Sequence, residues 1–583
     1  MKHSNLITIL LLIVLMLFSC TTKEVKSETL EIDEVSMPTK MDRKMPITVN
    51  NEIVSFSSTL DESEYEKSVS SKDNPYTLYD EDDLPTSYVF EDKILTSKDG
   101  KIKESNDSTI SYNYIISDSD LESITISSDV PYMITFSNTS VKATTTPALI
   151  LKGDGKCFIN LEGTLNLEDS VNNEKKGALT ASNDIIIFGD GELNLTVNKK
   201  HGFKIDGVLR VLSGNINVIT TKSAEGNAIS VDTYYIQDGG NVTIFATNDN
   251  YGSENKGIKV NGTEERESGK LVINGGRLYI ESVDKALTAG WKLAEDAETE
   301  TTADDPDPSL YINNGVITII TTGTIYEVSE EESLSPEGIE AKNNLVINGG
   351  LIQVSTSDDS LNAGSLIEIN GGYIFCQSRN ADAVDSNGLI NITGGVLIAL
   401  GSNAPEMGID CDFSENFTYK GGTIITISGA NNNAPDSNDT TGYVIRENLT
   451  GNSFALLDKD GNVVLAYTVP TSHESKNALM IASDDITKDS TYYFISDATM
   501  TGNNIFNGII SDAKVTGNKT EIIISNHVNG ESQEMGRGMM PPEGFDKPHM
   551  APPEGFDSTR MTPPDGFNPA RMAPPKGFKE FKK

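Results

Sequence analysis

Apolar and polar residues alternate in short runs over residues 335–422, and these runs repeat. The segments PEGIEAKNNLVINGG, DDSLNAGSLIEINGG, ADAVDSNGLINITGG and EMGIDCDFSENFTYKGG each end in a pair of glycines. The pairs end at Gly350, Gly372, Gly395 and Gly422, which gives spacings of 22, 23 and 27 residues. A period in the low twenties without a helical pattern predicts a β-solenoid.

Each period contains three runs in which every second residue is apolar, such as Ile339–Ala341, Leu345–Ile347 and Ile352–Val354. This alternation indicates strands with one buried face, and three inward faces per turn predict a triangular coil. Successive coils stack as parallel strands about 4.8 Å apart, and parallel crossovers wind right-handed by default. We therefore expect an all-β chain built on a right-handed parallel β-helix with coils of about 22 residues.

The position before the glycines carries an amide in several repeats: Asn274, Asn313, Asn348 and Asn370. Stacked asparagines predict an internal hydrogen-bonded ladder with a structural role.

Shifts in composition along the chain predict five segments: a lipoprotein signal peptide at 1–19, a disordered tether at 20–85, the β-helix with its N-terminal cap at 86–428, a small C-terminal β module at 429–530, and a disordered Pro-rich tail at 531–583.

Two acidic columns follow from the register of the repeat. Twelve residues before the first glycine of each pair lie Glu337, Asp359 and Asp382; nine residues before it lie Glu340, Asn362 and Asp385; Asp358 and Asp410 lie close to these columns. Like charges on neighbouring strands repel by up to roughly 3 kcal/mol per pair at an effective dielectric of about 20, so the columns need a counter-charge. Calcium, which takes about 6 to 8 oxygen ligands, meets this need. A solvated acidic edge is the alternative interpretation.

These motifs resemble those of a bacterial carbohydrate-binding domain family of right-handed parallel β-helices similar in shape to pectate lyases. The matching motifs are EGIEA at 337–341, DSLNA at 359–363, DAVDS at 382–386 and the INGG runs, and the resemblance covers roughly residues 110–500. It implies calcium held by the acidic positions, and binding to cellulose-like or uronic-acid-containing polysaccharide.

The N-terminus predicts export. Lys2 and His3 precede an apolar run from Leu6 to Phe18, and Leu17-Phe18-Ser19-Cys20 fits a lipobox. Cys20 is then the lipidated first residue of the mature chain. We expect a protein anchored by lipid at the cell envelope, on the outer membrane or cell surface.

The charge of the chain limits its partners. With 86 acidic and 46 basic residues the net charge is -40, which disfavours nucleic acid and anionic membrane surfaces. An acidic polysaccharide needs a bridging cation for the same reason. Tyrosines just after the glycine corners, Tyr279, Tyr311 and Tyr373, are candidates for stacking on sugars, and Arg379 beside the acidic columns is a further ligand-binding candidate.

Two other function classes stay open. The first is a calcium-dependent polysaccharide lyase, which needs a Lys or Arg base near the metal, with Lys342 and Arg379 the basic residues near the columns. No motif marks such a base, so we expect no catalysis. The second is a structural surface protein or adhesin in which the β-helix is only a stalk. Its 11-residue tail repeats, with Phe545, Phe556, Phe567 and Phe578 evenly spaced, then contact a protein or cell-wall partner.

Overall fold

The computed structural model describes residues 46–49, 52–65, 83–175, 177–247, 255–263, 268–290, 307–329, 332–473 and 476–530. The chain divides into two compact units, Met1–Met45 and Pro46–Lys583, and all described residues lie in the second. The predicted signal peptide, Cys20 and the Pro-rich tail fall outside the described residues. Within the described ranges, no helix is long and apolar enough to cross a membrane.

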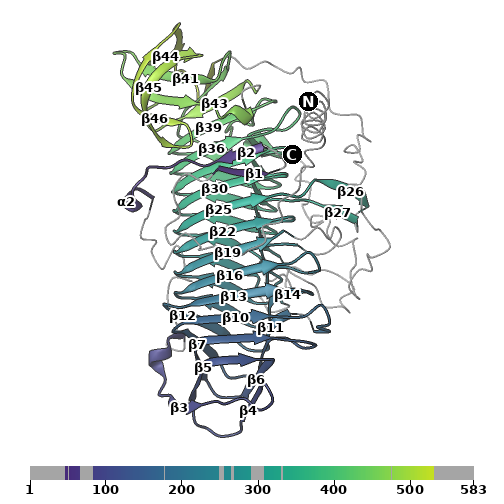
Figure 1. Ribbon diagram of the computed structural model, residues 1–583. Coiled ribbons are helices and arrows are strands. Elements are labelled where there is room, and N and C mark those ends of the chain that lie inside the picture. The colour runs from purple at the N-terminus through teal and green to yellow at the C-terminus, as the bar shows by residue number, and fades with distance from the viewer. Residues whose placement is uncertain are drawn as a thin grey trace, which may run out of the picture. The chain divides into compact units, whose positions relative to one another are not determined.

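Parallel strands form three stacks, with one strand of each stack per coil (Figure 1). The first stack, a 12-stranded sheet, consists of β4 (Lys101–Asn106), β6 (Ser123–Ser128), β8 (Leu149–Lys152), β11 (Gly177–Ala181), β14 (His201–Ile205), β17 (Ile229–Val231), β20 (Ile258–Val260), β23 (Leu287–Ala289), β28 (Ile339–Ala341), β31 (Leu361–Ala363), β34 (Val384–Ser386) and β37 (Ile409–Cys411).

The second stack consists of β9 (Cys157–Leu161), β12 (Ile185–Gly189), β15 (Val208–Val211), β18 (Tyr234–Gln237), β21 (Lys270–Ile273), β24 (Leu310–Ile312), β29 (Asn344–Ile347), β32 (Leu366–Ile369), β35 (Leu389–Ile392) and β38 (Phe417–Tyr419). The third stack consists of β10 (Thr164–Glu168), β13 (Glu192–Val197), β16 (Asn215–Thr220), β19 (Asn241–Ala246), β22 (Arg277–Ser282), β25 (Val316–Thr321), β30 (Leu351–Thr356), β33 (Tyr373–Ser378), β36 (Val396–Leu400) and β39 (Thr423–Ser428).

The second and third stacks are joined at the N-terminal end. The long strand β7 (Tyr132–Lys142) pairs with β9 through its first half and with β10 through its second half. It also pairs with β5 (Tyr112–Leu121), next to which β3 (Glu91–Ile94) forms the first strand. The inward-facing apolar residues of all three stacks form one continuous core. The predicted parallel β-helix is therefore confirmed.

The glycine corners and the amide ladder form as the sequence predicts. Gly372 has a φ of 88°, a conformation that L side chains rarely adopt, and an added Cβ would lie 2.9 Å from the backbone of Gly349 and Gly350. Beside the corners, the side-chain amides of Asn274, Asn313, Asn348 and Asn370 are linked by hydrogen bonds of 2.8, 2.8 and 3.0 Å. The ladder ties successive coils together without any charge.

The C-terminal module covers the end of the third stack. Its β43 (Ala478–Ala482) pairs antiparallel with β39 and with β40 (Val444–Asn448), which pairs with β48 (Val528–Gly530). A 6-stranded antiparallel sheet completes it: β45 (Thr499–Phe506), β46 (Ile509–Thr516), β42 (Val463–Thr468), β41 (Ser453–Asp458), β44 (Thr491–Ser496) and β47 (Thr520–Ile523). This module and the outer face of the last coils share a second apolar core, which includes Phe375, Ile398 and Phe454.

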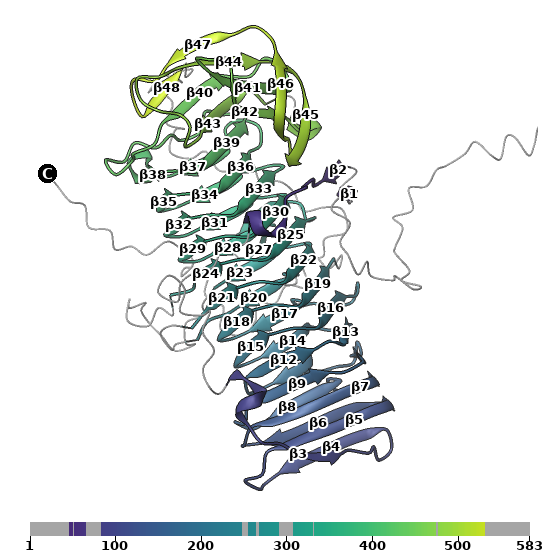
Figure 2. The same cartoon turned by 90° about the vertical axis from the view of Figure 1, so that its left-hand side faces the viewer.

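Part of the predicted disordered tether is ordered. It forms β1 (Pro46–Val49), β2 (Glu52–Ser55) and α2 (Glu62–Tyr65), and α2 lies beside β30 (Figure 2). Phe56, Leu60 and Tyr65 are at most 6% exposed and belong to the second apolar core. Asp83 forms ion pairs with Lys156 at 2.7 Å and with Arg210 at 2.9 Å. The prediction of disorder over 20–85 is wrong here because three large apolar side chains in a polar stretch are enough to dock it.

Candidate functional site

The two acidic columns lie along the C-terminal half of the first stack. The register pairs Glu340 of β28 with Asn362 of β31, Asn362 with Asp385 of β34, and Asp385 with Asp410 of β37. In each of these strands the residues on either side point into the core, so these polar side chains face outward. The second column, Glu337, Asp359 and Asp382, lies two residues before the first residue of each strand.

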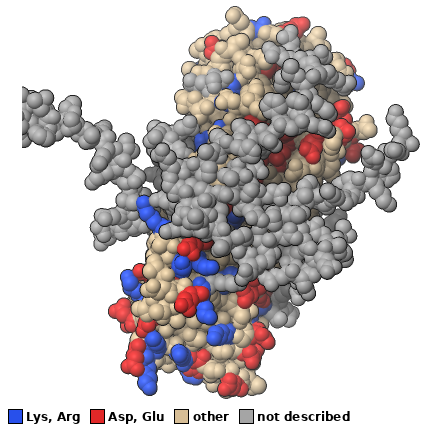
Figure 3. Space-filling model, turned by 90° about the vertical axis from the view of Figure 1, so that its right-hand side faces the viewer, with Lys and Arg blue, Asp and Glu red and all other residues tan. Residues whose placement is uncertain are grey.

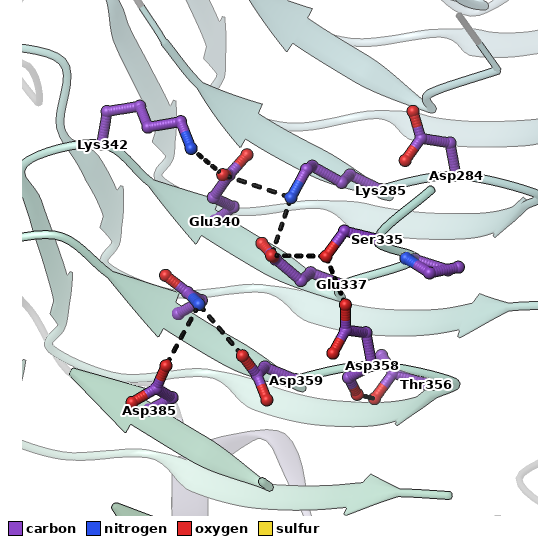
Figure 4. Close-up of polar contacts among 12 residues, drawn as sticks. Asp284, Lys285, Ser335, Glu337, Glu340, Lys342, Thr356, Asp358, Asp359 and Asp385 are labelled. Carbon is purple, nitrogen blue, oxygen red and sulfur yellow. Dashed lines mark hydrogen bonds and ion pairs between the residues drawn. The ribbon is translucent and has the colours of Figure 1, made fainter. Parts of the chain in front are cut away.

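A lysine neutralises the first rung of these columns. Lys285 Nζ lies 2.8 Å from Glu337 Oε1 and 3.2 Å from Glu340 Oε1 (Figure 4). Lys342 also forms an ion pair with Glu340. The counter-charge of Glu337 and Glu340, predicted from the repeat to be a metal ion, is the ammonium group of Lys285.

The two glutamates differ in pKa because Lys342 also pairs with Glu340, whereas the charges of Glu340 and Asp358 act on Glu337. Burial raises the pKa of Glu337 to about 7 even though Lys285 opposes the shift. Burial also acts on Glu340, but Lys285 and Lys342 together hold its pKa below the ordinary value. Burial would lower the pKa of Lys285, yet Glu337 and Glu340 raise it above its ordinary value. Lys285 therefore remains a cation and is unsuited to act as a general base.

Asp358 and Asp359 link the first rung to the later coils. Ser335 Oγ contacts Glu337 Oε1 at 3.2 Å and also forms a hydrogen bond with Asp358. The amide of Asn362 donates to Asp359 Oδ2 at 3.0 Å and lies 3.5 Å from Asp385 Oδ2. Burial, followed by the charges of Asp358, Asp385, Glu337 and Asp382, raises the pKa of Asp359 well above its ordinary value.

Asp382, Asp385 and Asp410 form a close carboxylate cluster. One carboxylate oxygen from each lies within 4.8 Å of the other two. Burial raises the pKa of Asp382 to about 8, although the backbone N–H of Met407 donates to it. Burial also raises the pKa of Asp410, which accepts a 2.8 Å hydrogen bond from Asn433. In the ranges described, no lysine or arginine forms an ion pair with Asp382 or Asp410.

This donor set fits a hard divalent cation. Oxygen ligands bind calcium at about 2.3 to 2.6 Å, so two ligands on opposite sides of one ion lie up to roughly 5 Å apart. The separation within the Asp382, Asp385 and Asp410 cluster agrees with this geometry. Of the seven predicted metal ligands, the structure brings these three together, places Asp359 beside them, and leaves Glu337, Glu340 and Asp358 around Lys285 and Ser335.

The predicted sugar-binding residues Tyr373 and Arg379 contact other parts of the protein. The Tyr373 ring packs edge-on against Phe506 of β45, with ring centroids 5.5 Å apart, and borders the second apolar core. Arg379 donates to Ser355 Oγ at 3.2 Å, to Ser357 Oγ at 2.6 Å and to the carbonyl of Thr321. These contacts give Tyr373 and Arg379 a structural role, and their binding of a ligand stays a prediction. Tyr311 is half-buried on the outer face of β24.

Lys285 is the residue of this site that the repeat motifs do not predict. It occupies the same register position as Glu337 and Asp359, two residues before the strand. Basic and acidic side chains also lie next to one another over the N-terminal coils, at the lower end of the molecule in Figure 3. The signal that could have identified Lys285 is its place one coil before Glu337 in a stack of parallel strands.

Comparisons with known proteins agree with the repeat motifs. Residues 109–383 match a family model described as "Carbohydrate-binding domain-containing protein". A solved structure described as a polysaccharide lyase-like protein from C. thermocellum, a gadolinium derivative, is 16% identical, with 52% of this chain and 97% of that chain covered and a TM-score of 0.28. No curated protein matches the chain. The family match confirms the resemblance to a carbohydrate-binding domain family, and its range contains Glu337, Asp359 and Asp382.

Proposed function

We propose that this protein is a lipid-anchored polysaccharide-binding protein of the cell envelope that has no catalytic activity and uses calcium. The observation that carries the proposal is the convergence of Asp382, Asp385 and Asp410 within 4.8 Å. Three carboxylates at this distance repel one another unless a cation or protons intervene. Calcium held there would compensate the repulsion and would offer open coordination positions to the carboxylate and hydroxyl oxygens of a sugar.

The net charge of -40 supports a bridging role for this ion. An anionic polysaccharide approaching so acidic a protein is repelled, and a divalent cation shared between the cluster and a uronate removes the repulsion locally. The family match supports carbohydrate as the ligand class. The two candidate bases support binding over lyase chemistry, because Lys342 forms an ion pair with Glu340 and Arg379 donates hydrogen bonds to Ser355 and Ser357, whereas a lyase needs an unprotonated base.

The test is calcium-dependent polysaccharide binding by residues 21–583, the mature chain without its lipidated Cys20. Residues 46–65 must be retained because Phe56, Leu60 and Tyr65 pack into the second apolar core. Calorimetric titration with calcium should show binding in the parent and not in the variant Asp382→Asn/Asp385→Asn. Polygalacturonate should bind only with calcium. Asp460→Asn, at an exposed turn, is the matched control and should behave like the parent.

Two further measurements separate the alternatives. Deletion of 536–583 should leave glycan binding intact, and loss of binding on deletion would favour the adhesin in which the tail binds the partner. Labelled palmitate should be incorporated by the parent in cells and not by Cys20→Ser. Failure of calcium to bind the parent, or equal binding by the double variant, would contradict the role of the cluster.

A further inference from the structure

Few large apolar side chains are exposed in the part of the chain that the structure describes. Seven of them are at least 37% exposed: Val89, Ile94, Ile110, Val171, Leu389, Phe413 and Ile523. Phe413, at 60%, is the one aromatic residue among these described seven, and it belongs to neither of the two large apolar cores. Leu389, at 44%, lies on the preceding coil. These two side chains are therefore apolar surface that the fold does not bury.

Both side chains lie at the corner that follows the acidic strands. β34 pairs with β37, which places Asp385 beside Asp410, and β35 pairs with β38 on the next face of the coil. Leu389 is the first residue of β35, and Phe413 lies in the connection from β37 to β38. In Figure 2 these four strands lie next to one another, just below the C-terminal module. Exposed apolar side chains on two successive coils are therefore within a few residues of the carboxylate cluster.

The connection that carries Phe413 is longer than the one on the preceding coil. Residues 387–389 lead from β34 into the core positions of β35, whereas residues 412–416 do the same between β37 and β38. The longer connection contains the 3-10 turn η4 (Ser414–Asn416), and the Asn416 N–H donates to the Phe413 carbonyl at 2.8 Å. The turn therefore has a defined backbone and holds its largest side chain outside the apolar core. An ordered surface turn that presents an aromatic ring is typical of a binding site.

The surroundings of the ring favour a sugar over a protein partner. Two apolar side chains cover too little surface for a stable protein interface, which buries about 1,200 to 2,000 Å² in total. The neighbouring exposed residues Asp412 and Glu415 are acidic. Asp410 of the cluster is three residues before Phe413, so their Cα atoms lie at most roughly 11 Å apart. A uronate polymer has the complementary form, because each sugar ring has an apolar C–H face and also carries a carboxylate for the cation.

We propose that Phe413, flanked by Leu389, is a stacking subsite for the sugar residue next to a uronate whose carboxylate is bound through calcium at Asp382, Asp385 and Asp410. The inference rests on the proposed function and extends it from one cation contact to two adjacent subsites on a single polysaccharide chain. The cation binds the anionic edge of the chain and the ring contacts its apolar face. The two subsites together therefore select a polyuronate over a neutral glucan.

The test measures binding of polygalacturonate to residues 21–583 by calorimetry in calcium. Phe413→Ala should weaken binding about ten-fold, Phe413→Leu should weaken it similarly because the flat ring is lost, and Phe413→Tyr should bind like the parent. Ile523→Ala is the matched control, since Ile523 is 59% exposed on β47 of the C-terminal module, and it should also bind like the parent. Calcium alone should bind all four variants as it binds the parent, because none of them changes a carboxylate. Thermal unfolding establishes that each variant is folded.

A fluorescent reporter tests the contact directly. Trp291 is the single tryptophan of the chain, so the variant Trp291→Phe/Phe413→Trp carries its tryptophan at the proposed subsite. Its emission should shift to shorter wavelength when polygalacturonate is added in calcium, and it should not change in EGTA. An emission spectrum that polygalacturonate leaves unchanged in calcium would overturn the inference.

The outcomes separate this inference from the proposed function. Equal affinity of the parent and Phe413→Ala for polygalacturonate would overturn the inference and leave the proposed function standing. Loss of calcium binding in Phe413→Ala would overturn it as well, because the ring would then support the cluster instead of contacting sugar. Association of two parent chains that Phe413→Ala abolishes, measured by light scattering, would assign the ring to a contact between copies and also overturn it. If polygalacturonate does not bind the parent in calcium, the proposed function fails and the inference fails with it.

Discussion

The earlier and the later coils of the first stack solve the same electrostatic problem differently. In the earlier coils, a lysine reaches an acid one coil further on: Lys204 pairs with Asp232 at 2.6 Å, Lys256 with Asp284, and Lys285 with Glu337 at 2.8 Å. In the later coils, the positions equivalent to Lys256 and Lys285 hold Asp359 and Asp382, and acid faces acid.

The difference shows that the register of the repeat determines where equivalent side chains lie but not whether they are acidic or basic. A parallel stack places equivalent side chains about 4.8 Å apart whatever they are. Where one of them is lysine, the protein supplies its own cation, and the acidic side chain does not need a metal ion. Where all are acidic, we expect protons or a cation from solution to offset the repulsion. The boundary between the two regimes falls at Glu337, which pairs with Lys285 on one side and adjoins Asp358 on the other.

Removal of the internal cation should have the largest effect. In Lys285→Met, Glu337 and Glu340 remain buried without their shared ion pair, and we expect the free energy of unfolding to fall by about 3 to 5 kcal/mol. Urea denaturation checks this. Lys142→Met is the matched control: Lys142 pairs with Glu168 at 2.9 Å but its side chain is 75% exposed, so the change should be within about 1 kcal/mol. Equal effects of the two substitutions would show that burial of the Lys285 pair is unimportant.

The acidic cluster should make the calcium-free protein sensitive to pH. The pKa of Asp382 is about 8 in the folded chain, against about 3.9 when unfolded, so between these values the folded state holds more protons. Stability contributed by this group is therefore lost as pH rises from about 5 to 8, by at most about 4 kcal/mol. Urea denaturation in EGTA across this range measures the effect. Calcium should flatten the profile, and a profile unaffected by calcium would contradict the cluster as its site.

The fold could be predicted from the sequence because the strand alternation, the glycine corners and the asparagine positions all indicate the same coil. Alternation in Leu345–Ile347 and Ile352–Val354, the corner at Gly372 and the asparagine before it all demanded the same coil, and each residue is placed as expected. Such consistency is strong evidence for one backbone. Docking of residues 56–65 was missed because its apolar side chains are irregularly spaced and only tertiary contact gives them a role.

The candidate site was predicted only in part because its chemistry depends on the neighbouring coil. Asp382, Asp385 and Asp410 are recognisable from the repeat, and the structure brings them together. The role of Lys285 depends on which coil follows it, and an insertion separates it from Glu337 in sequence. Tyr373 and Arg379 look like surface residues from the register alone. The contacts with Phe506 and with the Thr321 carbonyl, which a single repeat cannot reveal, make them structural.

Conversion of one aspartate to asparagine should relieve part of the charge repulsion that distinguishes the later coils from the earlier ones. Asp382→Asn removes one charge from the cluster while its oxygen can still accept from Met407, so we expect the calcium-free protein at pH 8 to gain about 2 to 3 kcal/mol. The same variant should lose most of the stabilisation by calcium. Thermal unfolding with calcium and with EGTA measures both. A variant that is less stable than the parent in EGTA would show that the charge of Asp382 is already compensated.

The amide ladder tests whether calcium acts on the acidic columns alone. It crosses the boundary between the two regimes, since Asn313 and Asn348 precede the acidic coils and Asn370 lies among them, and it carries no charge. Asn348→Ala leaves Asn313 Oδ1 and Asn370 Nδ2 without this partner, so the free energy of unfolding should fall by about 1 to 2 kcal/mol. The loss should be the same in calcium and in EGTA, because a neutral hydrogen bond does not respond to the cation. A calcium-dependent loss would mean that the ladder and the acidic cluster are coupled through the coils, and the two regimes would then no longer be independent.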